Sequence, residues 1–244
     1  LWPLGGRQAM HKMAARANRL AVLLQRPVET LTVAEAKELA GLQNTETYDE
    51  EVFTAEHAAF KAAHNAMFVD LSRYAAGDGA CFYLDGPQGG TTAALLGAGF
   101  ERRKLFTANW HPETAVALRE HLPAENVAAG RAEHALRAGL FATQPFAGLY
   151  IDGCGGSPEP IVGCIDALFD AERAVINPRR IAFGFTLTVA ERTGRSLADR
   201  EVDVQRALAA ACRKNSYTMT HVADEPGRYG ADPATGKREG GTLT

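Results

Sequence analysis

The stretch Tyr83–Phe100, YLDGPQGGTTAALLGAGF, decides the fold of this chain. An apolar run ends at Asp85, passes through a glycine-rich loop and continues into a helical pattern. A strand, a glycine-rich turn and a helix in this order begin a parallel α/β sheet, because parallel strands need a long crossover connection. Ligands of such sheets bind at the carboxyl ends of the strands, so this loop is also the first candidate site.

The same alternation continues to the end of the chain. Strands are predicted at 80–85, 104–109, 126–130, 146–152, 179–188, 217–224 and 240–244. Helices are predicted at 90–98, 112–122, 132–141, 159–169 and 197–215. Right-handed crossovers place helices on both faces of such a sheet. The fold class is therefore α/β: a three-layer, doubly wound, mostly parallel sheet of about seven strands.

Helical patterns fill the chain before the first strand. Thr32–Glu35, TVAE, has the form of a capping box, and apolar residues recur at helical spacing over 54–74. We therefore divide the chain into an N-terminal helical segment, 1–75, and an α/β domain, 76–244.

Composition narrows the class of protein. The 244 residues are 46% hydrophobic and 23% charged, with a net charge of −3, which argues against a wide nucleic-acid footprint. No apolar run reaches the ~20 residues of a membrane span, so no membrane partner is predicted. The first 28 residues contain no acid and five cations: Arg7, Lys12, Arg16, Arg19 and Arg26. A packed helix with a solvated basic face is favoured, while a nucleic-acid-facing helix and an organelle transit peptide stay open.

The cysteines are spaced neither as a disulfide framework nor as a zinc ribbon. They are Cys81, Cys154, Cys164 and Cys212. We expect reduced thiols, no metal site and a cytoplasmic protein, with an organelle as the alternative.

Three classes of cofactor compete for the glycine-rich loop. A P-loop needs a lysine on the phosphates, and the loop GPQGGTT has none. A dinucleotide fold needs GxGxxG, whereas the glycines here are Gly86, Gly89 and Gly90. The carboxylate of Asp85 suits instead a cofactor with positive charge and no phosphate.

These features resemble the Rossmann-like S-adenosylmethionine-dependent methyltransferases over residues 54–244. The resemblance implies a final strand that runs antiparallel. It also implies that the loop flanks the methionine moiety of the cofactor and that Asn109 replaces the acid that binds ribose. For Trp110, a role in covering the adenine ring and a purely packing role both stay open. Arg131 and Ala132 follow strand 126–130, where an acid usually contacts the adenine amino group. The implied cofactor residues are Asp85, Gly86, Gln88, Gly89, Gly90, Thr91, Asn109, Trp110, Arg131 and Ala132.

A second candidate stretch is YIDGCGGSPEP, Tyr150–Pro160. Asp152 ends an apolar strand and is the predicted catalytic residue, which accepts a proton or orients the acceptor. The stretch resembles the DPFGSP loop of tRNA guanine-N2 dimethyltransferases, which implies an RNA acceptor. Cys154, Ser157 and Thr186 are predicted to bind substrate. An alternative role for Cys154 is the covalent nucleophile of RNA cytosine-C5 methyltransferases, but no lysine or histidine lies beside it in sequence to activate the thiol.

The sequence thus predicts a methyltransferase that uses S-adenosylmethionine by direct in-line transfer, with RNA or a small molecule as acceptor. Asn109 and Arg131, which stand where the family has acids, motivate one alternative, a catalytically inactive partner or scaffold subunit. Another alternative is a P-loop-like phosphotransferase that lacks the lysine.

Overall fold

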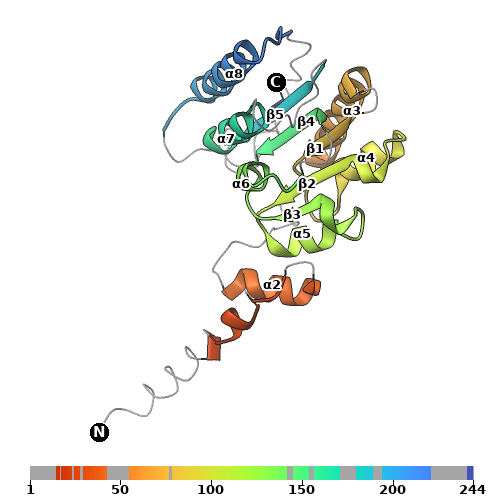
Figure 1. Ribbon diagram of the computed structural model, residues 1–244, viewed down its shortest axis with the longest axis vertical. Coiled ribbons are helices and arrows are strands. Elements are labelled where there is room, and N and C mark those ends of the chain that lie inside the picture. The colour runs from red at the N-terminus through yellow and green to blue at the C-terminus, as the bar shows by residue number, and fades with distance from the viewer. Residues whose placement is uncertain are drawn as a thin grey trace.

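The computed structural model describes residues 15–16, 18–23, 25–27, 30–42, 55–76, 79–141, 145–153, 157–170, 180–188, 194–220 and 241–243. A central sheet is flanked by helices on both faces (Figure 1). The strands are β1 (Ala80–Tyr83), β2 (Leu105–Asn109), β3 (Val127–Ala129), β4 (Phe146–Gly153), β5 (Ala182–Thr188) and β6 (Gly241–Leu243). The helices are α2 (Val33–Leu42), α3 (Ala55–Ala76), α4 (Gly90–Gly97), α5 (Pro112–Leu118), α6 (Ala132–Arg137), α7 (Glu159–Leu168) and α8 (Leu197–Lys214), with short 3-10 turns η3 (Arg102–Lys104) and η4 (Ala124–Asn126).

The strand order is β3-β2-β1-β4-β5-β6, and β1 to β5 are all parallel. The three-residue β6 pairs antiparallel with β5. The prediction of about seven strands is wrong for the described residues, which form six. Of the predicted strand 217–224, the first four residues have no regular structure, and 221–224 lie outside the described residues. Tyr217 is partly buried against the core, but the next three residues are exposed, so a continuous buried strand face is missing there.

Alternation along the strands builds two cores. In β1, Phe82 packs in a cluster with α6, α7 and α8, while Cys81 and Tyr83 pack in another with α3, α4 and α5. Both faces of the sheet are therefore covered by helices, as expected for parallel strands. Asp85 continues the alternation of Tyr83, which directs it toward the side of α3 and α4.

Helix α3 runs against the strand direction. Near its end, Ser72 lies where a Cβ on Gly148, early in β4, would come within 2.6 Å of its hydroxyl. Near its beginning, Lys61 forms an ion pair with Asp152, late in β4. The start of α3 is thus placed at the carboxyl edge of the sheet.

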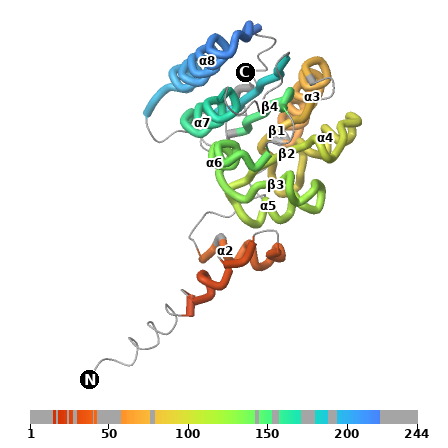
Figure 2. Tube along the Cα trace, in the orientation of Figure 1, coloured from red at the N-terminus to blue at the C-terminus, as the bar shows by residue number. Residues whose placement is uncertain are grey.

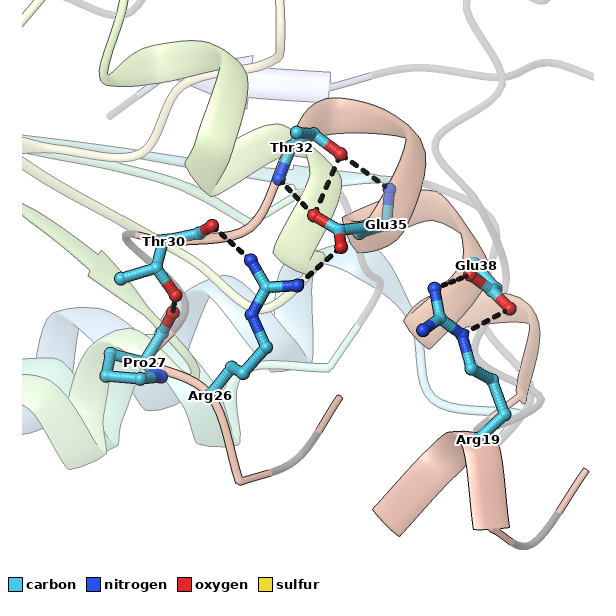
Figure 3. Close-up of polar contacts among 7 residues, drawn as sticks. All are labelled: Arg19, Arg26, Pro27, Thr30, Thr32, Glu35 and Glu38. Carbon is cyan, nitrogen blue, oxygen red and sulfur yellow. Dashed lines mark hydrogen bonds and ion pairs between the residues drawn. The ribbon is translucent and has the colours of Figure 1, made fainter. Parts of the chain in front are cut away.

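Helix α2 packs beside α5, at one end of the fold (Figures 1 and 2). Its capping box is formed: the Thr32 backbone N–H donates to Glu35 at 2.9 Å, and the Glu35 N–H donates to the Thr32 hydroxyl at 3.2 Å (Figure 3). Arg19 donates to Glu38 at 2.9 and 2.7 Å, and Arg26 pairs with Glu35. Both arginines form ion pairs within the N-terminal segment, which favours the packed helix over a nucleic-acid-facing one.

Among the described helices, none combines the length and the apolar character needed to cross a bilayer.

Candidate functional site

The candidate site lies where the strand order reverses. The chain proceeds outward from β1 to β2 and β3, and then returns to the other side of β1 with β4 and β5. Open α/β sheets bind ligands outside the carboxyl ends of their strands at such a switch point. The loop after β1, which begins near Asp85, and the end of β4, which contains Asp152, both lie at this edge.

Asp85 caps helix α4. Its Oδ1 accepts hydrogen bonds from the backbone N–H groups of Gly86 at 3.0 Å and Thr91 at 3.2 Å. Its Oδ2 accepts from the Thr92 backbone N–H and the Thr92 hydroxyl, both at 2.8 Å. Only 6% of Asp85 is exposed. The carboxylate therefore accepts hydrogen bonds from the backbone amides at the start of α4, and it faces the loop rather than the open edge.

Burial shifts the pKa of Asp85. Desolvation raises the pKa of this carboxyl, and the bonds from Thr92 and Thr91 and the nearby charge of Lys61 act in the opposite direction. A phosphate at the start of α4 would have to displace this carboxylate or lie against it, and two anions at one buried site repel. The helix terminus that usually binds phosphate is therefore already taken.

The conformation of the rest of the loop depends on Gly89 and on contacts with neighbouring side chains. Gly89 has φ +64°, the left-handed region that favours glycine, and a Cβ there would lie 3.0 Å from the His121 ring. Thr91 is buried, and its hydroxyl donates to Asn65 of α3 at 3.0 Å. Gln88 and Gly90 are exposed. Of the predicted loop residues, Gln88 and Gly90 are thus accessible to solvent, while the Thr91 side chain contacts α3.

Asn109 ends β2 and joins two strand ends. Its side-chain amide donates to the backbone carbonyl of Asp85 at 2.9 Å, and its Oδ1 accepts from the His111 backbone N–H at 2.8 Å. Trp110, next along the chain, is 57% exposed, and its ring lies edge-to-face on His111 with centroids 4.6 Å apart. An exposed indole beside the carboxyl end of β2 presents a flat apolar surface to solvent, where a ring can stack.

Arg131 and Ala132 follow β3. The backbone N–H of Gly130 donates to the Asn109 carbonyl at 2.9 Å, which ties this turn to the end of β2. Arg131 forms an ion pair with Glu133 at 2.8 Å, and Ala132 is buried. Arg131 therefore pairs with the acid two residues later in the chain.

Asp152 is held by two partners. The hydroxyl of Thr186, its register partner on β5, donates to Oδ1, and the ammonium of Lys61 contacts Oδ2. The side chains of Lys61 and Asp152 are 26% and 10% exposed. Thr186 therefore lies at the candidate site and its predicted substrate contact stays a prediction, whereas sequence reasoning missed Lys61.

The sequence does carry one signal for Lys61. It is the only lysine or arginine between Lys37 and Arg73, within a helix that is otherwise mostly small or apolar. A lone cation on such a helix needs a partner when it is partly buried. One turn later, His64 is 1% exposed, and burial and then the charge of Lys61 lower its pKa to about 4.

The other two predicted substrate residues are Cys154 and Ser157. Cys154 lies outside the described residues. Ser157 is exposed, and its hydroxyl donates to Glu159 at the start of α7. Within the described part of the chain, no group of three or more His, Cys, Asp or Glu side chains could hold a metal ion.

A groove of about 400 Å³ lies between α3 and α4 and is lined mainly by small side chains. Its lining is Ala62, Asn65, Ala66, Val69, Asp70, Gly90, Ala94, Gly97 and Ala98. It touches the loop through Gly90 but does not reach Asn109 or Asp152, so it is separate from the edge described above.

Comparison with known proteins finds no family model that the sequence matches and no curated protein with significant similarity to it. The class that the fold and the switch-point loop define is an α/β protein with a Rossmann-like parallel sheet.

Proposed function

We propose that this chain is an S-adenosylmethionine-dependent methyltransferase that transfers the methyl group directly to its acceptor. The observation that carries the proposal is the capping of α4 by Asp85, which fills the phosphate position at the switch point. A cofactor that binds there has to lack phosphate at that position, and S-adenosylmethionine carries none. This capping also argues against the P-loop-like phosphotransferase.

The charges and surfaces of the edge fit the same cofactor. Asp152, whose side chain is 10% exposed, places a carboxylate at the edge beside Lys61, and a carboxylate there suits a ligand with a positive group. Trp110 offers a stacking surface for the adenine, and the loop residues Gly86 to Gly90 would flank the methionine moiety. The antiparallel pairing of β6 with β5 also supports the resemblance, which implies a final antiparallel strand.

The bound cofactor would supply an already activated methyl group. The chain then has to place the acceptor in line and to handle its proton. Asp152, which is held by Thr186 and Lys61 at the end of β4, is the residue we assign to orienting the acceptor. We extend the proposal to an RNA acceptor, on the likeness of the stretch Tyr150–Pro160 to the tRNA methyltransferase loop, with a small molecule as the other acceptor class.

Fluorescence of Trp110 tests cofactor binding directly. The sequence has two tryptophans, so Trp2→Phe leaves Trp110 as the only indole. S-adenosylhomocysteine should change its emission saturably and should raise the unfolding temperature, since a ligand at a hundredfold excess over its Kd stabilises by about 2.7 kcal/mol. ATP–magnesium and NAD should do neither.

A matched pair of variants locates the site. Trp110→Ala should weaken S-adenosylhomocysteine about tenfold, because stacking on a base contributes ~1–3 kcal/mol. Tyr74→Ala removes an aromatic that is 72% exposed near the other end of α3 and should leave the affinity unchanged. If millimolar S-adenosylhomocysteine alters neither emission nor unfolding, the proposal is wrong.

If S-adenosylhomocysteine binds, a second experiment tests the acceptor. It measures transfer of a labelled methyl group to unmodified RNA, which should be lost in Asp152→Asn.

One set of contacts favours a second candidate, the non-catalytic partner subunit. Both side-chain atoms of Asn109 that would meet a ribose already have bonds within the chain, and both oxygens of Asp152 are engaged. A chain of this kind would keep the fold and bind no cofactor in the fluorescence experiment.

A further inference from the structure

One acid follows each of the paired strands β1 and β4 at the switch point, Asp85 after β1 and Asp152 late in β4. Tyr83 of β1 and Tyr150 of β4 are register partners, and the Leu84 backbone N–H donates to the Tyr150 carbonyl at 3.0 Å, which extends the pairing. Two residues further on, the same register places Asp85 beside Asp152. Neighbouring strands lie ~4.8 Å apart, and side chains two residues apart point to the same face. Both acids thus follow the face of the two tyrosines, which α3 covers.

The ammonium of Lys61 interacts electrostatically with both acids. It contacts Oδ2 of Asp152 directly, and its charge also acts on Asp85, whose carboxylate is buried in the loop. No other residue of α3 between its start and Arg73 carries a permanent positive charge. Lys61 is therefore the positive group that pairs with Asp152 at the edge where the cofactor would lie.

We propose that Lys61 is the specificity-determining residue of this site, because its ammonium holds the cation position beside Asp152 that a positive group of the ligand would otherwise take. The inference rests on the proposed function for the identity of that ligand. S-adenosylmethionine carries a sulfonium and an ammonium, whereas S-adenosylhomocysteine keeps only the ammonium. A resident cation therefore disfavours the charged reactant relative to the uncharged-sulfur product.

Calorimetric titration of three variants tests this charge competition. In Lys61→Met, which keeps most of the length of the side chain without its charge, the affinity for S-adenosylmethionine relative to S-adenosylhomocysteine should rise about tenfold. In Lys61→Arg, which keeps the charge, the ratio should stay within about twofold of the original protein. Methylthioadenosine, which has neither positive group, controls for shape and should bind all three alike. An unchanged ratio in Lys61→Met would overturn the inference, whereas a purely structural role would weaken all three ligands together.

A second probe works without the cofactor. Trimethylsulfonium ion should raise the unfolding temperature of Lys61→Met, and of Lys61→Gln as a second neutral variant, but not of the original protein or Lys61→Arg. Sodium chloride at equal ionic strength and dimethyl sulfoxide are the controls. Adding Asp152→Asn should abolish the gain. If the neutral variants gain nothing, there is no cation position, whether or not the cofactor binds. If they do gain but S-adenosylhomocysteine fails to bind the original protein, the proposed function alone is wrong.

Discussion

Replacing Asp85 by alanine should destabilise the fold and open the start of α4 to phosphate. The change leaves three backbone N–H groups without the carboxylate, those of Gly86, Thr91 and Thr92. Thr91 and Thr92 are 0% and 1% exposed, so water does not readily replace the lost acceptor. An unpaired buried N–H costs ~1–3 kcal/mol. Because removal of a buried charge offsets part of this, we expect a net loss of about 3 kcal/mol.

Urea unfolding at neutral pH measures the loss. Asp85→Asn keeps one acceptor oxygen and should lose about half as much as Asp85→Ala. Millimolar inorganic phosphate should then stabilise Asp85→Ala, since the freed amides and helix terminus can bind an anion, and should leave the original protein unchanged. The argument for a phosphate-free cofactor fails if Asp85→Ala unfolds within about 1 kcal/mol of the original protein, or if phosphate stabilises both equally.

The pH dependence of Asp85 gives a separate check on its burial. Its pKa is raised in the fold, so between the usual aspartate value of ~3.9 and that raised value the folded chain binds more protons than the unfolded chain. Stability should therefore fall as pH rises through this window, and Asp85→Asn should remove the fall. Unfolding free energies of both proteins, measured from pH 4 upward, contradict this if their difference is constant.

Two further predictions concern buried groups. Burial lowers the pKa of His64 to about 4 in the fold, so between about pH 6.5 and 4 the unfolded chain binds a proton that the folded chain does not. As the pH falls through this window, the free energy of unfolding should decrease by about 3 kcal/mol, and His64→Leu should remove this decrease. An unchanged pH profile in His64→Leu would show that the ring is not buried in its neutral form. Gly148→Ala should cost about 2 kcal/mol in chemical unfolding, because the new Cβ would lie 2.6 Å from Ser72 Oγ and 2.7 Å from Cys81 Sγ. Gly97→Ala in α4 meets nothing within 4 Å and should be neutral or stabilising; equal losses in the two variants would refute the steric argument.

Local pattern was enough for most of the α/β core. Short apolar runs predicted β1 to β5, and the amphipathic runs between them predicted α4 to α8. Both predictions were possible because the periodicity of strands and helices is a property of residues that are close in sequence. Ends were less accurate: the helix predicted at 112–122 ends at Leu118, and the one at 132–141 ends at Arg137. The strand predicted at 217–224 was wrong over its first four residues, which lie beyond α8 and of which Tyr217 packs against the core while the next three are exposed.

The sequence by itself determined that Asp85 and Asp152 end buried strands, since an acid after an apolar run marks the edge of a core. Only the tertiary structure decided what each carboxylate binds. Asp85 turns inward to the amides of α4, although the sequence suggested a contact with a ligand. Asp152 meets Lys61, which comes from a helix that precedes the sheet. Hydrogen bonds and ion pairs depend on distance in space, and the crossing of α3 over the carboxyl edge, which no local pattern encodes, sets that distance.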